Sequence, residues 1–194
     1  MRIIAGKWRG LRLAPVGKGD AAAHLRPTAE RVRESLFNVL SGGALDTVLA
    51  GARVLDLFAG TGALGLEALS RGAGHACLVD NGKRAQAMIR RNIALCGAQT
   101  QSILMRQDAT RLGRNPGAPH SLIFLDPPYG KGLGERALLR ARAGGWVAHG
   151  AVVVAEDSAP MPSPEGFDLH AHRRYGNTWI TIMRAVDERY RDSP

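Results

Sequence analysis

Residues 53–65 read RVLDLFAGTGALG, and this stretch decides the fold. The apolar run at residues 53–58 is typical of a buried strand, and the pattern at residues 63–71 is typical of a helix. Glycines lie between the two, where a strand must turn sharply into a helix. The G-x-G-x-x-G spacing over residues 60–65 indicates the first strand–turn–helix unit of a doubly wound α/β fold.

Apolar runs and helical patterns alternate along the rest of the chain. Predicted helices cover residues 63–71, 83–96 and 133–143, and predicted strands cover 53–58, 76–79, 102–105, 122–125 and 152–155. Short strands that alternate with helices predict a parallel sheet with helices on both faces. Residues 169–175 and 178–183 flank Gly176-Asn177 and predict a terminal antiparallel hairpin. The expected fold class is therefore α/β, with a doubly wound, mostly parallel, seven-stranded sheet.

Four acids stand at the ends of four successive predicted strands: Asp56, Asp80, Asp108 and Asp126. Any one of them could simply cap a helix. The carboxyl ends of parallel strands meet at one edge of the sheet, and doubly wound sheets bind their ligands at that edge. Four acids in phase with their strands therefore predict a binding site there.

The position of Asp56 bears on which ligand this site binds. A nicotinamide dinucleotide presents a pyrophosphate to the helix N-terminus and gains nothing from a nearby carboxylate, whereas the ammonium of S-adenosylmethionine would gain from it. Asp80, 20 positions after Gly60, could accept both ribose hydroxyls, and Asp108 could accept an adenine amino hydrogen. The residues predicted to bind this cofactor are Asp56, Phe58, Ala59, Gly60, Thr61, Gly62, Asp80, Asp108, Ala109 and Asp126.

A second motif, Asp126-Pro127-Pro128-Tyr129, follows the apolar run at residues 122–125. Two prolines cannot continue a central strand, so the chain must turn out of the sheet there. The turn brings together a carboxylate and a carbonyl, which can accept the two hydrogens of an exocyclic amine, and a ring that can stack on a flipped base. We therefore predict Asp126, Pro127, Pro128 and Tyr129 as catalytic residues.

Positive charge is concentrated near the N-terminus. The chain carries a net charge of +9, and residues 1–40 contribute +5 of it, from eight Lys or Arg and three acids. An excess of this kind with an interleaved tryptophan favours a nucleic-acid partner over a solvated face. The residues predicted to bind RNA are Lys7, Trp8, Arg9, Arg12, Arg26 and Arg33.

The same N-terminal region has predicted structure of its own. Residues 1–14 predict a small β-hairpin, residues 15–27 predict a loop, and a helix is expected to begin at Thr28. Arg31 and Arg33 lie two apart on that helix and cannot share one narrow face, so one of them is expected to serve structure. We expect residues 1–41 to form an RNA-binding extension and residues 42–194 to form the cofactor-binding domain.

Several classes of protein are not indicated. No apolar stretch approaches the roughly 20 residues of a membrane span, and the first residues lack the apolar core of a secretion signal. Cys77 and Cys96 fall in a predicted strand and a predicted helix as apolar fillers, and the six His residues lack the spacing of metal ligands. We expect a cytoplasmic monomer that needs no metal.

The chain resembles the bacterial RsmD-type methyltransferases over nearly its whole length. The likeness is carried by residues 2–10, 26–28, 31–38, 56–65 and 126–129. It implies a class I S-adenosylmethionine-dependent methyltransferase fold and methyl transfer to the 2-amino group of one guanine in 16S ribosomal RNA. It also implies ribosomal RNA as the partner, either naked or within an assembling small-subunit particle. The chain departs from the family at Asp80, where a longer Glu is more common.

Three other functions stay open on the sequence. A DNA adenine 6-amino methyltransferase also uses D-P-P-Y, but such enzymes usually carry a separate target-recognition segment, for which little of this chain is left. A nicotinamide-dependent oxidoreductase leaves Asp56 and the D-P-P-Y motif unexplained. A non-catalytic, basic RNA-binding assembly factor would have no need of acids at four strand ends.

Overall fold

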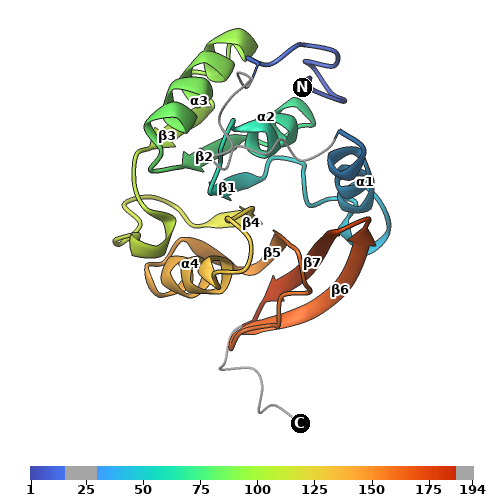
Figure 1. Cartoon of the computed structure of the whole chain (residues 1–194), viewed down its shortest axis with the longest axis vertical. Coiled ribbons are helices and arrows are strands. Elements are labelled where there is room, and N and C mark those ends of the chain that lie inside the picture. The colour runs from blue at the N-terminus through green and yellow to red at the C-terminus, as the bar shows by residue number, and fades with distance from the viewer. Residues whose placement is uncertain (16–29, 187–194) are drawn as a thin grey trace.

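The computed structural model describes residues 1–15 and 30–186. They form one seven-stranded sheet with helices on both faces (Figure 1). The strands are β1 (Arg53–Leu57), β2 (His75–Val79), β3 (Ser102–Met105), β4 (His120–Leu125), β5 (Val147–Asp157), β6 (Phe167–Tyr175) and β7 (Thr178–Ala185). Their order in the sheet is β3-β2-β1-β4-β5-β7-β6.

The sheet is parallel except at one strand. β1 to β5 all run in one direction, and β7 is antiparallel to both of its neighbours, β5 and β6. The strand order reverses beside β1, so the carboxyl ends of β1 and β4 flank the point at which doubly wound sheets open a crevice. The predicted fold class and the terminal hairpin are confirmed. The position of β7 between β5 and β6 was not predicted.

Helices cover the two faces unequally. One face carries α1 (Glu30–Leu40), α2 (Ala63–Ser70) and α3 (Lys83–Cys96), and the other carries α4 (Leu133–Ala143); short 3-10 turns lie at Gly43–Leu45 (η2) and Ala109–Arg111 (η3). Side chains alternate along β1: Val54 packs toward α2, and Leu55 and Leu57 pack toward α4. Because both faces are covered, the strands are apolar almost throughout, as the sequence indicated. Both cysteines are buried and free, which agrees with their predicted role as apolar fillers.

The N-terminal segment, residues 1–15, is less regular than the predicted hairpin. A single antiparallel bridge pairs Arg2 with Arg12, and no strand forms within the segment. The chain nevertheless turns back on itself, because Ile3 and Leu11 are joined by a backbone hydrogen bond of 2.9 Å. Too few residues pair across this turn to make a ladder, so the segment depends on the rest of the molecule for its conformation.

The N-terminal segment docks on α2. Two of its backbone N–H groups donate to the fully buried Glu67 carboxylate, at 2.7 and 3.0 Å. Gly6 lies so close to the helix that a Cβ atom there would be 1.8 Å from the Ser70 carbonyl oxygen. These contacts cross the predicted domain boundary at residue 41, and the division into two domains stays a prediction. The predicted helix start at Thr28 lies outside the described residues.

Candidate active site

Five carboxylates stand along the carboxyl edge of the sheet, in the order of the strands that carry them. Asp108 follows β3, Asp80 follows β2, Asp56 lies one residue before the end of β1, and Asp126 follows β4. Glu156, near the end of β5, is the fifth. The structure thus brings the four predicted acids to one edge and adds another.

The turn from β1 into α2 has a left-handed backbone at three points. The φ angle is +62° at Phe58, +56° at Gly60 and +76° at Gly62. Glycine adopts this conformation readily, but at Phe58 it costs about 1–3 kcal/mol and persists only where the surroundings hold it. The hydrogen bond from the Ala59 N–H to the Val79 carbonyl (3.0 Å) supplies part of that restraint. The other predicted cofactor residues of this edge are at most 8% exposed: Ala59, Thr61 and Ala109.

Asp56 is buried beneath this turn. Its side chain is 1% exposed, and its carboxylate accepts the N–H of Gly65 in the first turn of α2 at 3.0 Å. Burial raises the pKa of Asp56 to about 7 against the opposing effect of that hydrogen bond. The carboxylate thus contacts the N-terminus of α2, and the predicted contact of Asp56 with a cofactor ammonium stays a prediction.

Asp80 and Asp108 hold the backbone of neighbouring turns. The two oxygens of Asp80 accept the N–H groups of Gly60 and Gly82, each at 2.8 Å, and burial raises the pKa of Asp80. Asp108 accepts the hydroxyl and the N–H of Thr110 at 2.7 and 2.8 Å, and the hydroxyl bond lowers the pKa of Asp108. A carboxylate has about four lone-pair sites, so both acids can accept further hydrogens from a ligand.

The corner at residues 126–129 lies beside the end of β1. The Asp126 N–H donates to the Leu57 carbonyl at 3.4 Å. Pro127 is buried, Asp126 and Pro128 are half-buried, and Tyr129 is exposed. The corner therefore presents a carboxylate and an aromatic ring next to the glycine turn, as the motif predicts.

Tyr129 is held by a residue that sequence reasoning missed. Its hydroxyl donates to the Glu156 carboxylate at 2.9 Å, and Glu156 is only 6% exposed. Burial raises the pKa of Tyr129, and the nearby Glu156 charge raises it further, so the phenol stays a hydrogen-bond donor. The signal is present in the sequence, because Glu156 follows the apolar run at residues 152–155 just as the other acids follow theirs.

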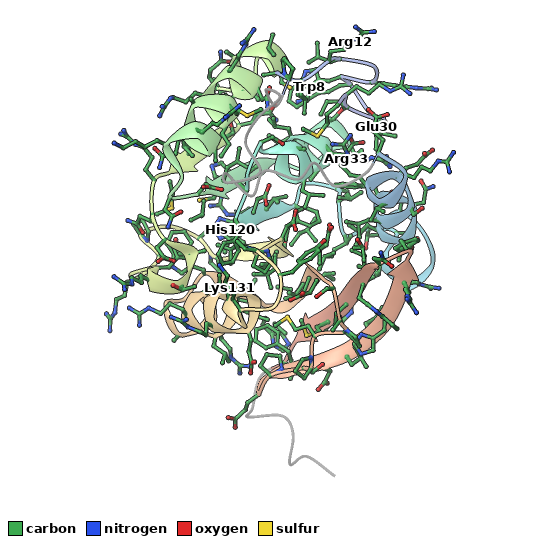
Figure 2. The ribbon with its side chains drawn as sticks, viewed as in Figure 1. Trp8, Arg12, Glu30, Arg33, His120 and Lys131 are labelled. Carbon is green, nitrogen blue, oxygen red and sulfur yellow. The ribbon has the colours of Figure 1, made fainter. Side chains whose placement is uncertain are left out.

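The predicted RNA-binding residues have different degrees of exposure. Lys7, Arg9 and Arg12 are exposed, while Trp8 is half-buried with the Lys7 ammonium 4.2 Å from its ring centre. Figure 2 shows Trp8 and Arg12 at the same end of the molecule. Arg26 lies outside the described residues.

Arg33 does not reach the surface. Its side chain is 0% exposed and donates to the Arg2 carbonyl, and burial lowers the pKa of its guanidinium while Glu67 and Glu30 favour its charge. The prediction that Arg33 binds RNA is wrong, because an enclosed guanidinium cannot contact a phosphate. Arg31 is exposed, so Arg33 is the arginine of the pair that serves structure.

Lys7 and Trp8 lie near the opposite edge of the sheet from the acids. Their backbone N–H groups donate to the Ser70 carbonyl (2.8 Å) and hydroxyl (3.0 Å), and the Lys7 ammonium donates to Gln101 at 2.7 Å. Ser70 ends α2 and Gln101 directly precedes β3, so both mark the amino edge. The structure therefore does not bring these two residues to the acid-lined edge.

A metal-binding cluster and a membrane-spanning helix are both absent from residues 1–15 and 30–186. Within residues 1–15 and 30–186, His, Cys, Asp and Glu side chains form no cluster of three or more that could hold a metal ion. Within the same residues, no helix combines the length and the apolar character that crossing a membrane requires. A pocket of about 210 Å³ lies between the N-terminal segment and α1, where Arg2 and Arg9 face Glu30 and Glu34.

The sheet order, the glycine turn and the acids at consecutive strand ends define a class I methyltransferase fold. A solved Escherichia coli structure, yhhF, has the same architecture, with a TM-score of 0.81, 35% sequence identity, and coverage of 96% of this chain and 98% of that one. Residues 1–184 match the family model described as Conserved hypothetical protein 95. The chain belongs to this family.

Curated relatives cover most of the chain as well. Ribosomal RNA small subunit methyltransferase D of Escherichia coli strain K12 is 37% identical over 179 residues, which are 91% of this chain and 85% of the relative. The protein of the same name from Haemophilus influenzae is 32% identical over 181 residues, which are 91% of this chain and 89% of the relative. The resemblance to RsmD-type methyltransferases is confirmed.

Proposed function

We propose that this enzyme transfers a methyl group from S-adenosylmethionine to the exocyclic 2-amino group of a guanine in small-subunit ribosomal RNA. The proposal rests chiefly on one observation: the corner at residues 126–129 adjoins the glycine turn at residues 58–62, through the hydrogen bond between Asp126 and Leu57. The names of the curated relatives support ribosomal RNA as the substrate. We further propose that the protein is a cytoplasmic monomer and that its substrate is either naked RNA or an assembling small-subunit particle.

The residues present at the edge suit S-adenosylmethionine. The left-handed backbone at Phe58, Gly60 and Gly62 would let a ligand approach the main chain closely, because two of these three residues carry no side chain. Asp80 would accept the ribose hydroxyls, and Asp108 would accept an adenine amino hydrogen. Both carboxylates have lone pairs that their hydrogen bonds within the protein do not use. Asp56 acts from beneath, by fixing the N-terminus of α2. Bound there, S-adenosylmethionine would supply an electrophilic methyl carbon.

The corner residues would act on the guanine amine. Its lone pair is delocalised into the ring, so the amine is a poor nucleophile until that delocalisation is reduced. The Asp126 carboxylate and the Pro127 carbonyl would accept its two hydrogens, which favours a nitrogen lone pair that points away from them. Fixed acceptors stabilise the positive charge that develops on nitrogen during transfer. Pro128 fixes the turn, and Tyr129 would stack on the extruded base.

The contacts with RNA would extend beyond the carboxyl edge of the sheet. Lys7, Arg9 and Arg12 are exposed, and we propose that they contact phosphates, which would make affinity depend on salt with little sequence information. Since Lys7 lies at the amino edge of the sheet, the RNA would have to span the molecule along its α2 and α3 side.

The proposal is tested by mass-spectrometric nucleoside mapping of ribosomal RNA from cells with and without the gene. We expect loss of one 2-methylguanosine from small-subunit RNA. Loss of a 6-methyladenine instead would favour the adenine methyltransferase. Titration of the protein with S-adenosylmethionine complements the mapping, because binding without any methyl transfer would favour the assembly factor.

A further inference from the structure

Asn92 in α3 joins two regions that carry different proposed roles. Its side-chain Nδ2 donates to the Thr61 carbonyl of the glycine turn at 2.8 Å, and its Oδ1 accepts the Ala14 N–H at 2.7 Å. Asn92 is 0% exposed, and Thr61 and Ala14 are 8% and 4% exposed. A single buried amide therefore bridges the cofactor turn and the N-terminal segment.

The two hydrogen bonds depend on each other. A buried polar group that loses its hydrogen-bond partner is destabilising, because its desolvation is no longer offset by a hydrogen bond. Without the Ala14 N–H, the Asn92 oxygen would lose its hydrogen-bond donor among the described residues, and the amide would no longer be held in the orientation that donates to Thr61. The Thr61 carbonyl lies between Gly60 and Gly62, two residues with a left-handed backbone and no side chain of their own.

The N-terminal segment is fixed at its other end to the same cofactor unit. Glu67 and Ser70 of α2 bind the backbone of residues 4–8 through their side chains. Because α2 begins at the glycine turn, the segment contacts that unit both at the helix and, through Asn92, at the turn. Lys7 and Trp8 lie at the amino edge, away from the acids. RNA binding by these two residues would not require the buried contacts that join the N-terminal segment to the glycine turn and to α2.

We propose that Asn92 is a positioning residue through which the N-terminal segment shapes the cofactor turn, so that the segment is required for affinity toward S-adenosylmethionine even without RNA. The identity of the ligand rests on the proposed function. Asn92 itself contacts only backbone groups, and it acts on the cofactor through the Thr61 carbonyl.

Two full-length variants separate the two bonds. Asn92→Asp keeps an acceptor for the Ala14 N–H but places a carboxylate oxygen against the Thr61 carbonyl. Ala14→Pro removes the N–H and leaves Asn92 intact; residue 14 precedes Pro15, which already favours the extended backbone that proline adopts. Ser102→Ala is the matched control, since it removes a buried hydrogen bond of 2.7 Å to Ala98 at the amino edge.

Affinity for S-adenosylmethionine is measured by calorimetry without RNA, beside the melting temperature. We expect both variants to bind S-adenosylmethionine at least about 10-fold more weakly than the wild type, a loss of at least about 1.4 kcal/mol. The Ser102→Ala control should melt at a temperature similar to that of the two variants but bind like the wild type. If Asn92→Asp and Ala14→Pro both bind like that control, the inference is overturned. If the wild type itself does not bind S-adenosylmethionine, it is the proposed function that fails.

Hydrogen exchange on the wild type provides a test that needs no variant. Addition of S-adenosylmethionine should slow amide exchange in the peptide that contains Ala14, as well as in the glycine turn. Slower exchange confined to the turn would contradict the inference, because a turn coupled to the N-terminal segment cannot be stabilised by itself.

Discussion

At the scale of single residues, the buried Asp56 makes the stability of the fold depend on pH. Its pKa is raised from 3.8 to about 7 by burial, so the folded protein favours the protonated acid more than the unfolded chain does. Between these two pKa values the folded state binds a proton that the unfolded state has released. The free energy of unfolding therefore falls as the pH rises through this window, and the full penalty is present above about pH 7.

Asp56→Asn should remove this penalty. The amide oxygen can still accept the Gly65 N–H, and no charge is buried. We expect the variant to be more stable than the wild type at about pH 8, by at most about 4 kcal/mol, and to gain little at about pH 4. Urea unfolding at the two pH values measures this, with the exposed Asp46→Asn as control. An equal gain at both pH values would contradict the assigned cause.

Tyr129 and Glu156 should act as a pair. Tyr129→Phe keeps the stacking ring but loses the hydroxyl that fixes it, and Glu156→Gln weakens the acceptor. We expect each to lower kcat about 10-fold while affinity for S-adenosylmethionine is unchanged, because only the base platform is loosened. The double variant should lose little more than either single one. Steady-state kinetics with small-subunit RNA checks this, and the exposed Glu135→Gln is the control; additive losses would mean that the two residues act separately.

Residue-level prediction succeeded where a local pattern carries the information. The acids were found because each lies near the end of an apolar run, and Glu156 could have been found by the same rule. The burial of Arg33 could not, since it depends on the packing of α1 against a segment distant in sequence. The direction of the Asp56 side chain likewise depends on how closely α2 approaches β1, which no local pattern reports.

At the scale of elements, the contact between α2 and the sheet depends on Gly65. A Cβ atom there would lie 2.4 Å from Leu78 Cδ2 and 3.2 Å from the Asp56 carboxylate. Leu78 is fully buried and cannot move aside freely. The third glycine of the fingerprint is thus required for close approach of helix and strand.

Gly65→Ala should therefore destabilise the protein. Overpacking costs about 1–3 kcal/mol, and the better helix propensity of alanine returns about 1 kcal/mol. We expect a net loss of up to about 2 kcal/mol in the free energy of unfolding, together with weaker cofactor binding. Gly113→Ala is the control, because its Cβ would meet nothing within 4 Å. Denaturant unfolding measures the free energy of unfolding of both variants. Equal losses in the two would exclude a clash between the added methyl group and Leu78 as the cause.

The predicted limits of the helices agree closely with the observed ones, because periodicity and flanking glycines are local signals. The predicted helices at 83–96 and 133–143 have the observed limits. The N-terminal hairpin was overestimated, because alternation alone does not reveal that the backbone of residues 4–8 is bound by α2.

At the scale of the whole molecule, charge is separated from chemistry. The acids line the carboxyl edge, and the exposed Lys7 lies by the amino edge. A polyanion that reaches both must cover an extended surface, so its affinity should contain a large, salt-dependent contribution from phosphates.

Reversal of charge at Lys7 and Arg9 tests this arrangement. We expect Lys7→Glu and Arg9→Glu each to weaken RNA binding and to reduce the salt slope by about 1, with little effect on affinity for S-adenosylmethionine. The control is Arg114→Glu, an exposed reversal on the loop that precedes β4. Filter binding over a range of salt concentrations provides the slopes, and slopes equal to that of the control would remove the N-terminal segment from the RNA interface.

The position of β7 has a consequence for how the chain is made. β7 is synthesised after β6, yet it lies inside the sheet between β5 and β6. Until Thr178–Ala185 has emerged during translation, both neighbours present unpaired edges, which are sites of aggregation. A stalled nascent chain that ends before residue 178 should therefore be sensitive to protease and bound by chaperones, and release of the last strand should be the event that completes the domain.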